Sequence, residues 1–220
     1  MDDPDVDPSA LRESLAYIRK INRVMGYTRI ILSELERFSS KWKKGELIRI
    51  VDVGTGSADI PLAILRLADE RGWNVRVIGV DLHPEVARQA SAEAQDPRLT
   101  IVRADALHLP MADEGCEYAI TSMFLHHLDD ADARKALTEL GRVARRGIIA
   151  SDLLRLHRAY AFIWIATLFS SPMVRHDARV SVAQAFNTRE VLALRKAANL
   201  HYAQYSTHGW HRFILAGEKT

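Results

Sequence analysis

The chain has 220 residues, of which 48% are hydrophobic and 26% are charged, which suits one globular α/β domain and excludes general disorder. Its formal net charge is only +2 and its basic residues are scattered, which argues against nucleic acid as the main partner. The single cysteine, Cys116, excludes an internal disulfide and is interpreted as a small buried hydrophobe.

The chain shows no targeting or membrane-spanning signal. Its acidic start, MDDPDVDPSA, is the opposite of a basic and then apolar signal peptide. The most apolar stretch, 159–169, is about half of the ~20 residues needed to span a bilayer. We therefore expect a cytoplasmic protein.

The first 44 residues predict a helical cap ahead of the main fold. Ser9 can cap a helix, and a second helical stretch runs to Phe38 before the linker SSKWKKGE. Apolar residues in this region recur at three- and four-residue steps, namely Leu11, Leu15, Ile18, Ile21, Met25 and Ile30.

From Glu46 onward, short apolar runs alternate with helical stretches. Strands are predicted over 46–53, 74–81, 98–105, 116–123 and 146–153, with helices over 58–71, 84–95 and 130–145. Five such strands, mostly apolar on both faces and alternating with helices, indicate a parallel sheet with right-handed crossovers. This part, 45–152, is expected to bind a cofactor.

The last third departs from this alternation. It predicts a helix over 153–169, a loop over 171–182 and a helix over 188–198, followed by strands HYAQYST and HRFILAG. Only about three residues separate these strands, too few for a parallel crossover, so the last strand should be antiparallel. The predicted fold is one α/β domain, a Rossmann-like, doubly wound seven-stranded sheet with a helical lid insertion over 153–187 and a final part over 188–220.

The stretch VDVGTGSADI, residues 51–60, places a glycine turn after the first strand. In a dinucleotide-binding fingerprint a third glycine follows and leaves the helix N-terminus open to pyrophosphate. Here Asp59 stands at that position, and Asp52 lies two residues before Gly54. Two carboxylates oppose phosphate and favour a cationic ligand without phosphate, such as S-adenosylmethionine.

Two further acids follow the next strands. Asp81 is placed to accept from both ribose hydroxyls, and Asp105 to accept from an adenine amino group, with Leu82, Ala106 and Leu107 as apolar walls. Each acid alone also fits a helix cap or a turn. Three acids at successive strand ends together indicate a cofactor site.

These stretches resemble the class I S-adenosylmethionine-dependent methyltransferases. The matching segments are VDVGTGSADI, VIGVDLHPEVARQA, VRADALHLPMADEGCEYAITSMFLHHL and GIIASDL, and with the terminal hairpin the resemblance covers about residues 46–220. LAYIRKINRVMGYTR and SMFLHHL are similar to the small-molecule branch that includes ubiquinone- and menaquinone-pathway enzymes and natural-product O-methyltransferases of secondary metabolism. The predicted cofactor residues are Asp52, Gly54, Thr55, Gly56, Asp59, Asp81, Leu82, Asp105, Ala106, Ser122, Arg29 and Tyr17.

The resemblance implies a diffusible acceptor, phenolic or polyketide-like. No Asn/Asp-Pro-Pro-aromatic motif follows the fourth strand, because SMFLHHL stands there, so DNA-base methylation is not expected. A phenol gains from a base that takes its proton, and His126 or His127 can supply one. Asp152 can orient the imidazole, bind the acceptor or cap the next helix. His127 is the preferred candidate of the pair.

The lid insertion supplies the other candidates. Tyr160, Trp164 and Phe169 on the predicted helix, with Arg175 and Asp177 in the predicted loop, are expected to contact the acceptor. His176 with Asp177 is a second possible base. In the helical cap, Tyr17, Arg19, Asn22 and Arg29 can close over the methionine end of the cofactor or form the wet face of a surface helix.

The expected function is transfer of a methyl group to a hydroxyl of a small, largely apolar molecule. C-methylation of a quinone-type ring and a catalytically inactive cofactor-binding module stay open as alternatives. A nicotinamide oxidoreductase is disfavoured by Asp59, and no metal site is expected. A monomer and a homodimer are equally compatible with the sequence.

Overall fold

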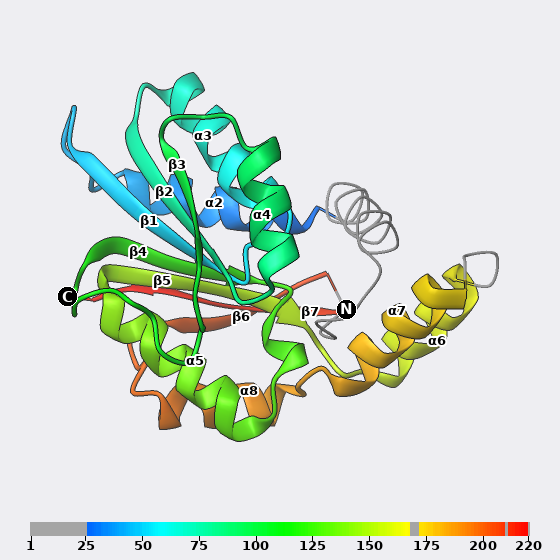
Figure 1. Cartoon of the computed structure of the whole chain (residues 1–220). Helices are drawn as coiled ribbons and strands as arrows, with labels where there is room; N and C mark the ends of the chain where they lie inside the picture. Colours follow the sequence, from blue (N-terminus) through cyan, green and yellow to red (C-terminus); the bar gives the residue numbers. More distant parts are fainter. Residues whose placement is uncertain (1–25, 168–171, 210, 220) are drawn as a thin grey trace.

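The computed structural model of the chain describes residues 26–167, 172–209 and 211–219. Within these ranges a seven-stranded sheet has the order β3-β2-β1-β4-β5-β7-β6 (Figure 1). The strands are β1 Leu47–Val53, β2 Asn74–Asp81, β3 Leu99–Arg103, β4 Cys116–Ser122, β5 Ala144–Leu153, β6 Gln204–His208 and β7 Arg212–Glu218.

Strands β1 to β5 are parallel to their neighbours, whereas β7 runs antiparallel to both β5 and β6. The short turn after β6 leaves no length for a crossover, which is the physical reason for this reversal. The predicted Rossmann-like, doubly wound sheet with its antiparallel last strand is therefore confirmed. The sheet order reverses between β1 and β4, which is where ligands bind in open α/β sheets.

Helices cover both faces of the sheet (Figure 1). One apolar core lies under α2, α3 and α4, and a second lies under α5 and α8. All seven residues of β4 are buried, as expected for a central strand covered on both faces. The helices are α2 Tyr27–Ser39, α3 Asp59–Arg71, α4 Pro84–Glu93, the 3-10 turn η1 Leu125–His127, α5 Asp130–Val143, α6 His157–Ala166, α7 Pro172–Gln184 and α8 Thr188–Ala197.

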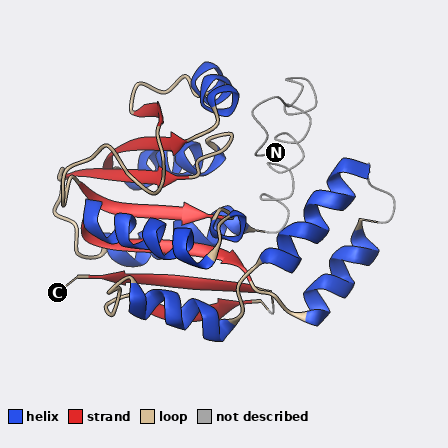
Figure 2. Cartoon of the chain, turned by 60° about the horizontal axis from the view of Figure 1, so that its bottom comes forward, coloured by secondary structure: helices blue, strands red, loops and turns tan. Residues whose placement is uncertain are grey.

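The lid insertion differs from the prediction. The segment 171–182 is not a loop, because α7 spans Pro172–Gln184 and packs antiparallel to α6 as a helical hairpin (Figure 2). Pro172 occupies the first helical position, where proline is tolerated because its missing N–H needs no partner. The predicted helix start at Leu153 is also wrong, since β5 runs through Leu153 and α6 begins at His157.

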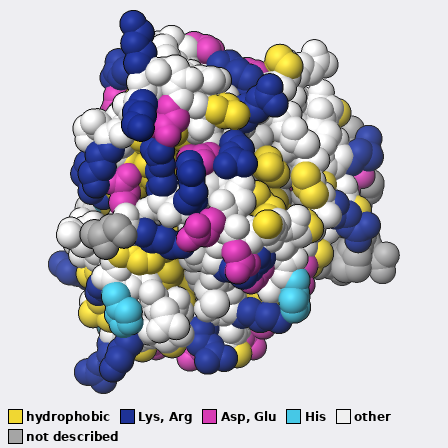
Figure 3. Space-filling model, turned by 90° about the vertical axis from the view of Figure 1, so that its left-hand side faces the viewer, with side chains coloured by type: hydrophobic (Ala, Val, Ile, Leu, Met, Phe, Trp, Pro, Cys, Tyr) yellow, Lys and Arg dark blue, Asp and Glu magenta, His cyan; other side chains and the backbone are white. Residues whose placement is uncertain are grey.

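Charged residues of both signs mix on the side of the molecule where the parallel strands begin (Figure 3). Glu117 of β4 is buried there and accepts hydrogen bonds from Arg49 at 3.0 Å and from Arg145 at 2.7 Å. Burial opposes ionisation of Glu117, but the hydrogen bonds and charges of the arginines lower its pKa. This network fixes the amino ends of β1, β4 and β5, opposite the carboxyl edge considered next.

No helix in the described ranges is long and apolar enough to cross a membrane. Cys116 is buried, and burial raises the pKa of its thiol to about 12, in agreement with its interpretation as a buried hydrophobe. The predicted helix after Ser9 lies outside the described residues, and the division of the chain into functional parts stays a prediction.

Candidate cofactor and acceptor site

The glycine turn follows β1 at the centre of the carboxyl edge. The backbone N–H groups of Gly54 and Thr55 both donate to the Val80 carbonyl at 2.9 Å, which ties the turn to the end of β2. Gly54 has φ +71°, and a Cβ there would lie 2.6 Å from the Phe124 ring. Gly56, with φ +55°, would place a Cβ in open space. The turn therefore closes on Phe124 at one glycine and stays open to a ligand at the other.

Asp52 lies beneath this turn, in the buried part of β1. It accepts a hydrogen bond from Thr55 Oγ1 at 2.8 Å. Burial raises the pKa of Asp52 to about 8; the Thr55 hydrogen bond opposes that rise, and the nearby Asp59 and Asp81 add to it. A positively charged ligand at the turn would lower the pKa of Asp52 again, whereas a phosphate would raise it further.

Asp81 connects the end of β2 to the glycine turn. Its carboxylate accepts from the backbone N–H of Gly56 at 3.0 Å and from that of His83 at 3.0 Å. The position at the strand end agrees with the predicted ribose acid, although the ribose contact itself stays a prediction. Leu82, predicted as an adenine wall, is exposed at the same edge.

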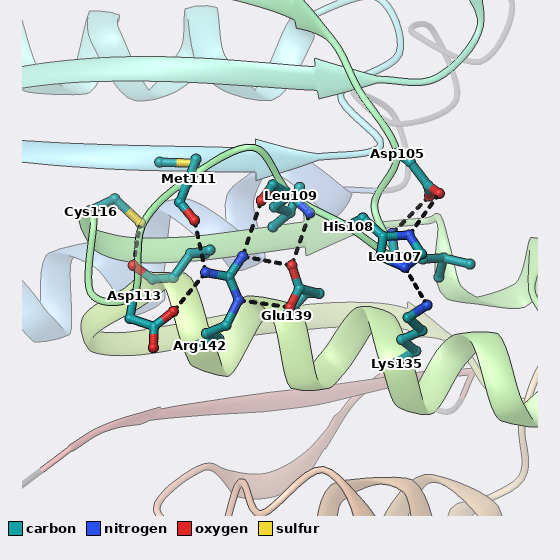
Figure 4. Close-up of polar contacts among 11 residues, drawn as sticks. Asp105, Leu107, His108, Leu109, Met111, Asp113, Cys116, Lys135, Glu139 and Arg142 are labelled. Atoms are coloured by element: carbon teal, nitrogen blue, oxygen red, sulfur yellow. Dashed lines mark hydrogen bonds and ion pairs between the residues drawn. The ribbon is translucent and has the colours of Figure 1, made fainter.

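The loop after β3 carries the third predicted acid (Figure 4). Asp105 accepts from the Leu107 backbone N–H at 2.8 Å, and its second oxygen lies 3.3 Å from His108 Nδ1. Lys135 Nζ of α5 lies 2.6 Å from His108 Nε2. Asp105 thus shapes its own turn, as a turn residue does, while Ala106 beside it is buried.

Arg142 of α5 holds the rest of this loop in place (Figure 4). Its guanidinium donates to the Met111 carbonyl at 2.7 Å and the Leu109 carbonyl at 3.1 Å, and it binds Glu139 and Asp113. Sequence reasoning missed Arg142. Its contacts hold the loop that follows Asp105, next to the predicted adenine site, in place.

The end of β4 contributes a buried hydroxyl and a strained residue. Ser122 Oγ is buried and has no hydrogen-bond partner among the described residues. Met123 follows with φ +57°, a left-handed conformation that non-glycine side chains rarely adopt. Such strain concentrates at functional sites. Ser122 stays a predicted cofactor residue, now with an unused polar atom at the expected place.

His126 and Asp152 form a buried pair where β4 and β5 end. His126 Nδ1 lies 2.7 Å from Asp152 Oδ1, and the side chains are 3% and 1% exposed. Asp152 also accepts the backbone N–H of His126 at 3.1 Å and of Leu153 at 2.6 Å. Burial opposes ionisation of Asp152, but the charge and hydrogen bonds of His126 and the backbone bonds lower its pKa.

Of the two candidate histidines, Asp152 holds His126 and not the preferred His127, and which imidazole faces the acceptor stays a prediction. Asp152 binds His126, whereas His127 is exposed, and its ring lies tilted by 36° against that of His126 with 4.2 Å between the centroids. The 3-10 turn places consecutive side chains in different directions, so only one histidine can face β5. Both line a cavity of 610 Å³ together with Leu128, Asp129, Asp130, Ala131, Arg155, Gln184, Phe186 and Glu190.

Tyr27 and Arg212 extend the buried pair, and sequence reasoning missed both. The Arg212 guanidinium lies 3.9 Å from the centroid of the Tyr27 ring, and both residues are buried. Burial raises the pKa of Tyr27 to about 12; Arg212 opposes this rise and Asp152 adds to it. The only feature of the sequence that could have indicated this contact is that Arg212 stands at the start of the apolar run RFILAG.

The other predicted residues are spread over the molecule. Arg29 is exposed on α2, and Tyr160, Arg175 and His176 line a separate cavity of 360 Å³ on the α6–α7 hairpin. Trp164 is exposed on α6 beside it. Tyr17, Arg19, Asn22 and Phe169 lie outside the described residues, as does the side chain of Asp177. Among the described side chains of this set, none lines the cavity beside the His126–Asp152 pair.

Comparison with known proteins agrees with this geometry. Residues 50–147 match the family model described as a methyltransferase domain. The chain is 34% identical over 107 residues to the demethylmenaquinone methyltransferase of Roseiflexus sp. (48% of this chain, 42% of the relative). It is 32% identical over 100 residues to the ubiquinone/menaquinone biosynthesis C-methyltransferase UbiE of Rickettsia bellii (44% of this chain, 40% of the relative).

The chain thus spans about two fifths of the length of these curated relatives. Over 98% of its own length it also superposes on a SAM-dependent methyltransferase from Aquifex aeolicus, covering 100% of that chain with a TM-score of 0.67 at 17% identity. The latter likeness concerns the fold alone.

The residues present suit S-adenosylmethionine, the cofactor of this class. The open side at Gly56, the acids at the ends of β1 and β2, and the unused Ser122 hydroxyl fit a ligand that carries an ammonium, a sulfonium and a ribose and lacks phosphate. Residues 50–147 thus match a methyltransferase domain, and the sheet order and the glycine turn agree with the fold of the class I S-adenosylmethionine-dependent methyltransferases.

Proposed function

We propose that this protein transfers a methyl group from S-adenosylmethionine to a small, largely apolar aromatic acceptor that carries a ring hydroxyl. The observation that supports this proposal best is the buried His126–Asp152 pair at the carboxyl ends of β4 and β5. Bound S-adenosylmethionine supplies an electrophilic methyl group, so the chain needs to position the acceptor and remove its proton.

His126 is the proposed general base. Because the ionised carboxylate of Asp152 can only accept, His126 Nδ1 carries the proton of their 2.7 Å hydrogen bond. The other ring nitrogen, Nε2, then has the lone pair that can take the proton of an acceptor hydroxyl. A ring hydroxyl has a pKa near ~10, so such a base raises its nucleophilicity near neutral pH. Asp152 stabilises the imidazolium that results.

Loss of this proton activates two atoms of the acceptor. The electron pair of the phenolate can attack the methyl carbon from oxygen, or from the ring carbon next to it; in either case the methyl–sulfur bond breaks and sulfur keeps its electron pair. After attack by carbon, the ring loses its proton and becomes aromatic again. The relative from Rickettsia bellii is a C-methyltransferase, which favours carbon. Oxygen is the alternative.

The acceptor would enter through the 610 Å³ cavity that His126 lines. Phe186 and Leu128 supply apolar parts of its wall, and Arg155 and Glu190, which also line it, form an ion pair at 2.5 Å. A wall of this kind suits a molecule with one apolar part and one polar part.

Product analysis tests the proposal. The full chain is incubated with S-adenosylmethionine labelled in its methyl group and with hydroxylated naphthalenes and hydroquinones that have one, two or no free hydroxyls. We expect labelled product only from acceptors with a free hydroxyl, and fragmentation in a mass spectrometer places the label on carbon or oxygen. Binding of the cofactor without labelled product from any of these acceptors would instead support a binding module.

A further inference from the structure

The α6–α7 hairpin extends away from the sheet beyond the carboxyl end of β5 (Figures 1 and 2). Its residues, 157–184, include three arginines, two histidines and one aspartate, with no lysine and no glutamate. Their formal charge of +2 equals that of the whole chain, so the other residues sum to zero. The hairpin therefore carries a net positive charge.

The same hairpin exposes aromatic side chains. Tyr160 is 43% exposed and Trp164 is 47% exposed, and they are two of the five large hydrophobic residues that are exposed within the described ranges. In the sequence, α6 has eight consecutive apolar residues, AYAFIWIA, directly after His157 and Arg158. Tyr and Trp next to arginines are typical of helices that lie in the interface of a membrane.

A basic cavity lies between the two helices. It measures 360 Å³ and is lined by Tyr160, Arg175, His176, Arg179, Val180 and Ala183. The Arg179 guanidinium lies 5.1 Å from the Trp164 ring centroid, and its Nε is buried without a hydrogen-bond partner among the described residues. Two guanidinium groups, an imidazole and a phenol hydroxyl make this cavity complementary to a phosphate.

We propose that the α6–α7 hairpin docks on an anionic lipid surface, with a lipid phosphate in the cavity beside Arg175 and Arg179 and with Trp164 and Tyr160 in the interface. Charge favours this partner, because arginines near a negatively charged bilayer are attracted to it. The exposed aromatic rings favour a bilayer over a soluble anion, which would need the arginines alone. None of the residues of the His126–Asp152 pair takes part in this contact.

Flotation of the full chain with vesicles tests this proposal. We expect binding to phosphatidylcholine vesicles that contain about one third phosphatidylglycerol, weak binding to phosphatidylcholine alone, and release at high salt. Arg158→Gln with Arg175→Gln should weaken binding roughly thirty-fold, about five-fold for each arginine, while the Arg179–Trp164 contact stays intact. Arg66→Gln with Arg76→Gln, two exposed arginines on α3 and β2, removes the same charge elsewhere and should leave binding unchanged.

Trp164→Ala separates the aromatic contribution from that of charge, and it should reduce vesicle binding at every salt concentration. Thermal unfolding of each variant shows whether the domain is intact. Equal binding of the two vesicle types would overturn the proposal, and so would an unchanged affinity in the Arg158/Arg175 variant. Full release by millimolar glycerol phosphate would also overturn it, because the cavity would then bind a soluble anion without a bilayer.

Discussion

The buried carboxyl of Asp52 predicts that cofactor affinity depends on pH. In the free protein burial raises the pKa of Asp52 to about 8, so this group is largely protonated at neutral pH. A cationic cofactor favours the ionised form and lowers that pKa on binding. Binding then releases a proton from Asp52, and affinity rises with pH below about 8.

The size of the effect follows from the ionised fraction. Below a pKa of about 8 this fraction grows roughly ten-fold for each pH unit, so the association constant should rise by up to ten-fold, or ~1.4 kcal/mol, between pH 6 and pH 7. This window lies below the pKa of an α-amino group, ~7.7–8.0, so the ammonium of the cofactor stays charged throughout.

Titration calorimetry with S-adenosylmethionine or S-adenosylhomocysteine at pH 6.0, 6.5 and 7.0 measures the slope, and buffers of different ionisation enthalpy count the protons released. Asp52→Asn is the matched control, because it keeps a side chain that can accept from Thr55 Oγ1 and cannot ionise. Its affinity should not rise over this range. An affinity of the wild-type protein that does not change with pH, or the same slope in Asp52→Asn, refutes the reasoning.

The same carboxyl affects the stability of the free protein. Its folded pKa is raised above the unfolded value of ~3.9, so its contribution to the free energy of unfolding is present below pH ~4 and is lost as pH rises towards about 8. Asp52→Asn should therefore be more stable than the wild-type protein at pH 8, as urea unfolding without cofactor measures. A lower stability of the variant at pH 8 would contradict this sign.

Two further substitutions test the two edges of the sheet. Gly54→Ala forces a Cβ to 2.6 Å from Phe124 at φ +71°, so we expect a loss of ~2–4 kcal/mol in unfolding free energy and weaker cofactor binding; near-normal urea unfolding would show that the turn tolerates a side chain. Glu117→Gln replaces the buried carboxylate that binds Arg49 and Arg145 with an uncharged amide that has only one acceptor oxygen, and it should cost ~2 kcal/mol above pH 5 with cofactor affinity unchanged. The pKa of Glu117 is lowered in the folded state, so its contribution to the free energy of unfolding is lost as pH falls through that pKa. The difference in unfolding free energy between Glu117→Gln and wild type should therefore shrink in acid. A difference that grows in acid would argue against a buried ionised Glu117.

Most of the sheet could be predicted because the central strands β1, β4 and β5 are largely buried and each helix between parallel strands has room for a crossover. The antiparallel β7 followed from the few residues after β6, a purely local constraint. The α6–α7 hairpin was harder to predict, because Ser171 and Pro172 indicate a loop locally. Helix α7 is instead held by tertiary packing of Val182 against Tyr27 and Leu153. Sequence periodicity does not report such a contact.

The candidate site divides in the same way. The acids at the ends of β1, β2 and β3 could be located from the sequence because strand ends meet at one edge of the sheet. The partner of Asp152 could not, since the choice between His126 and His127 depends on the direction of side chains in a three-residue turn. Arg212 reaches Tyr27 from the other end of the chain, a contact that no spacing rule indicates.

The most direct test of the proposed base is the rate of a single turnover in His126→Gln and His127→Gln, measured with saturating labelled S-adenosylmethionine and a hydroxylated acceptor. His126→Gln should slow methyl transfer by ~10²–10⁴-fold with the cofactor dissociation constant within about two-fold of wild type, since a general base acts in the transition state. His127→Gln should change the rate far less. The account is contradicted if His126→Gln transfers the methyl group at the wild-type rate, or if His127→Gln suffers the larger loss.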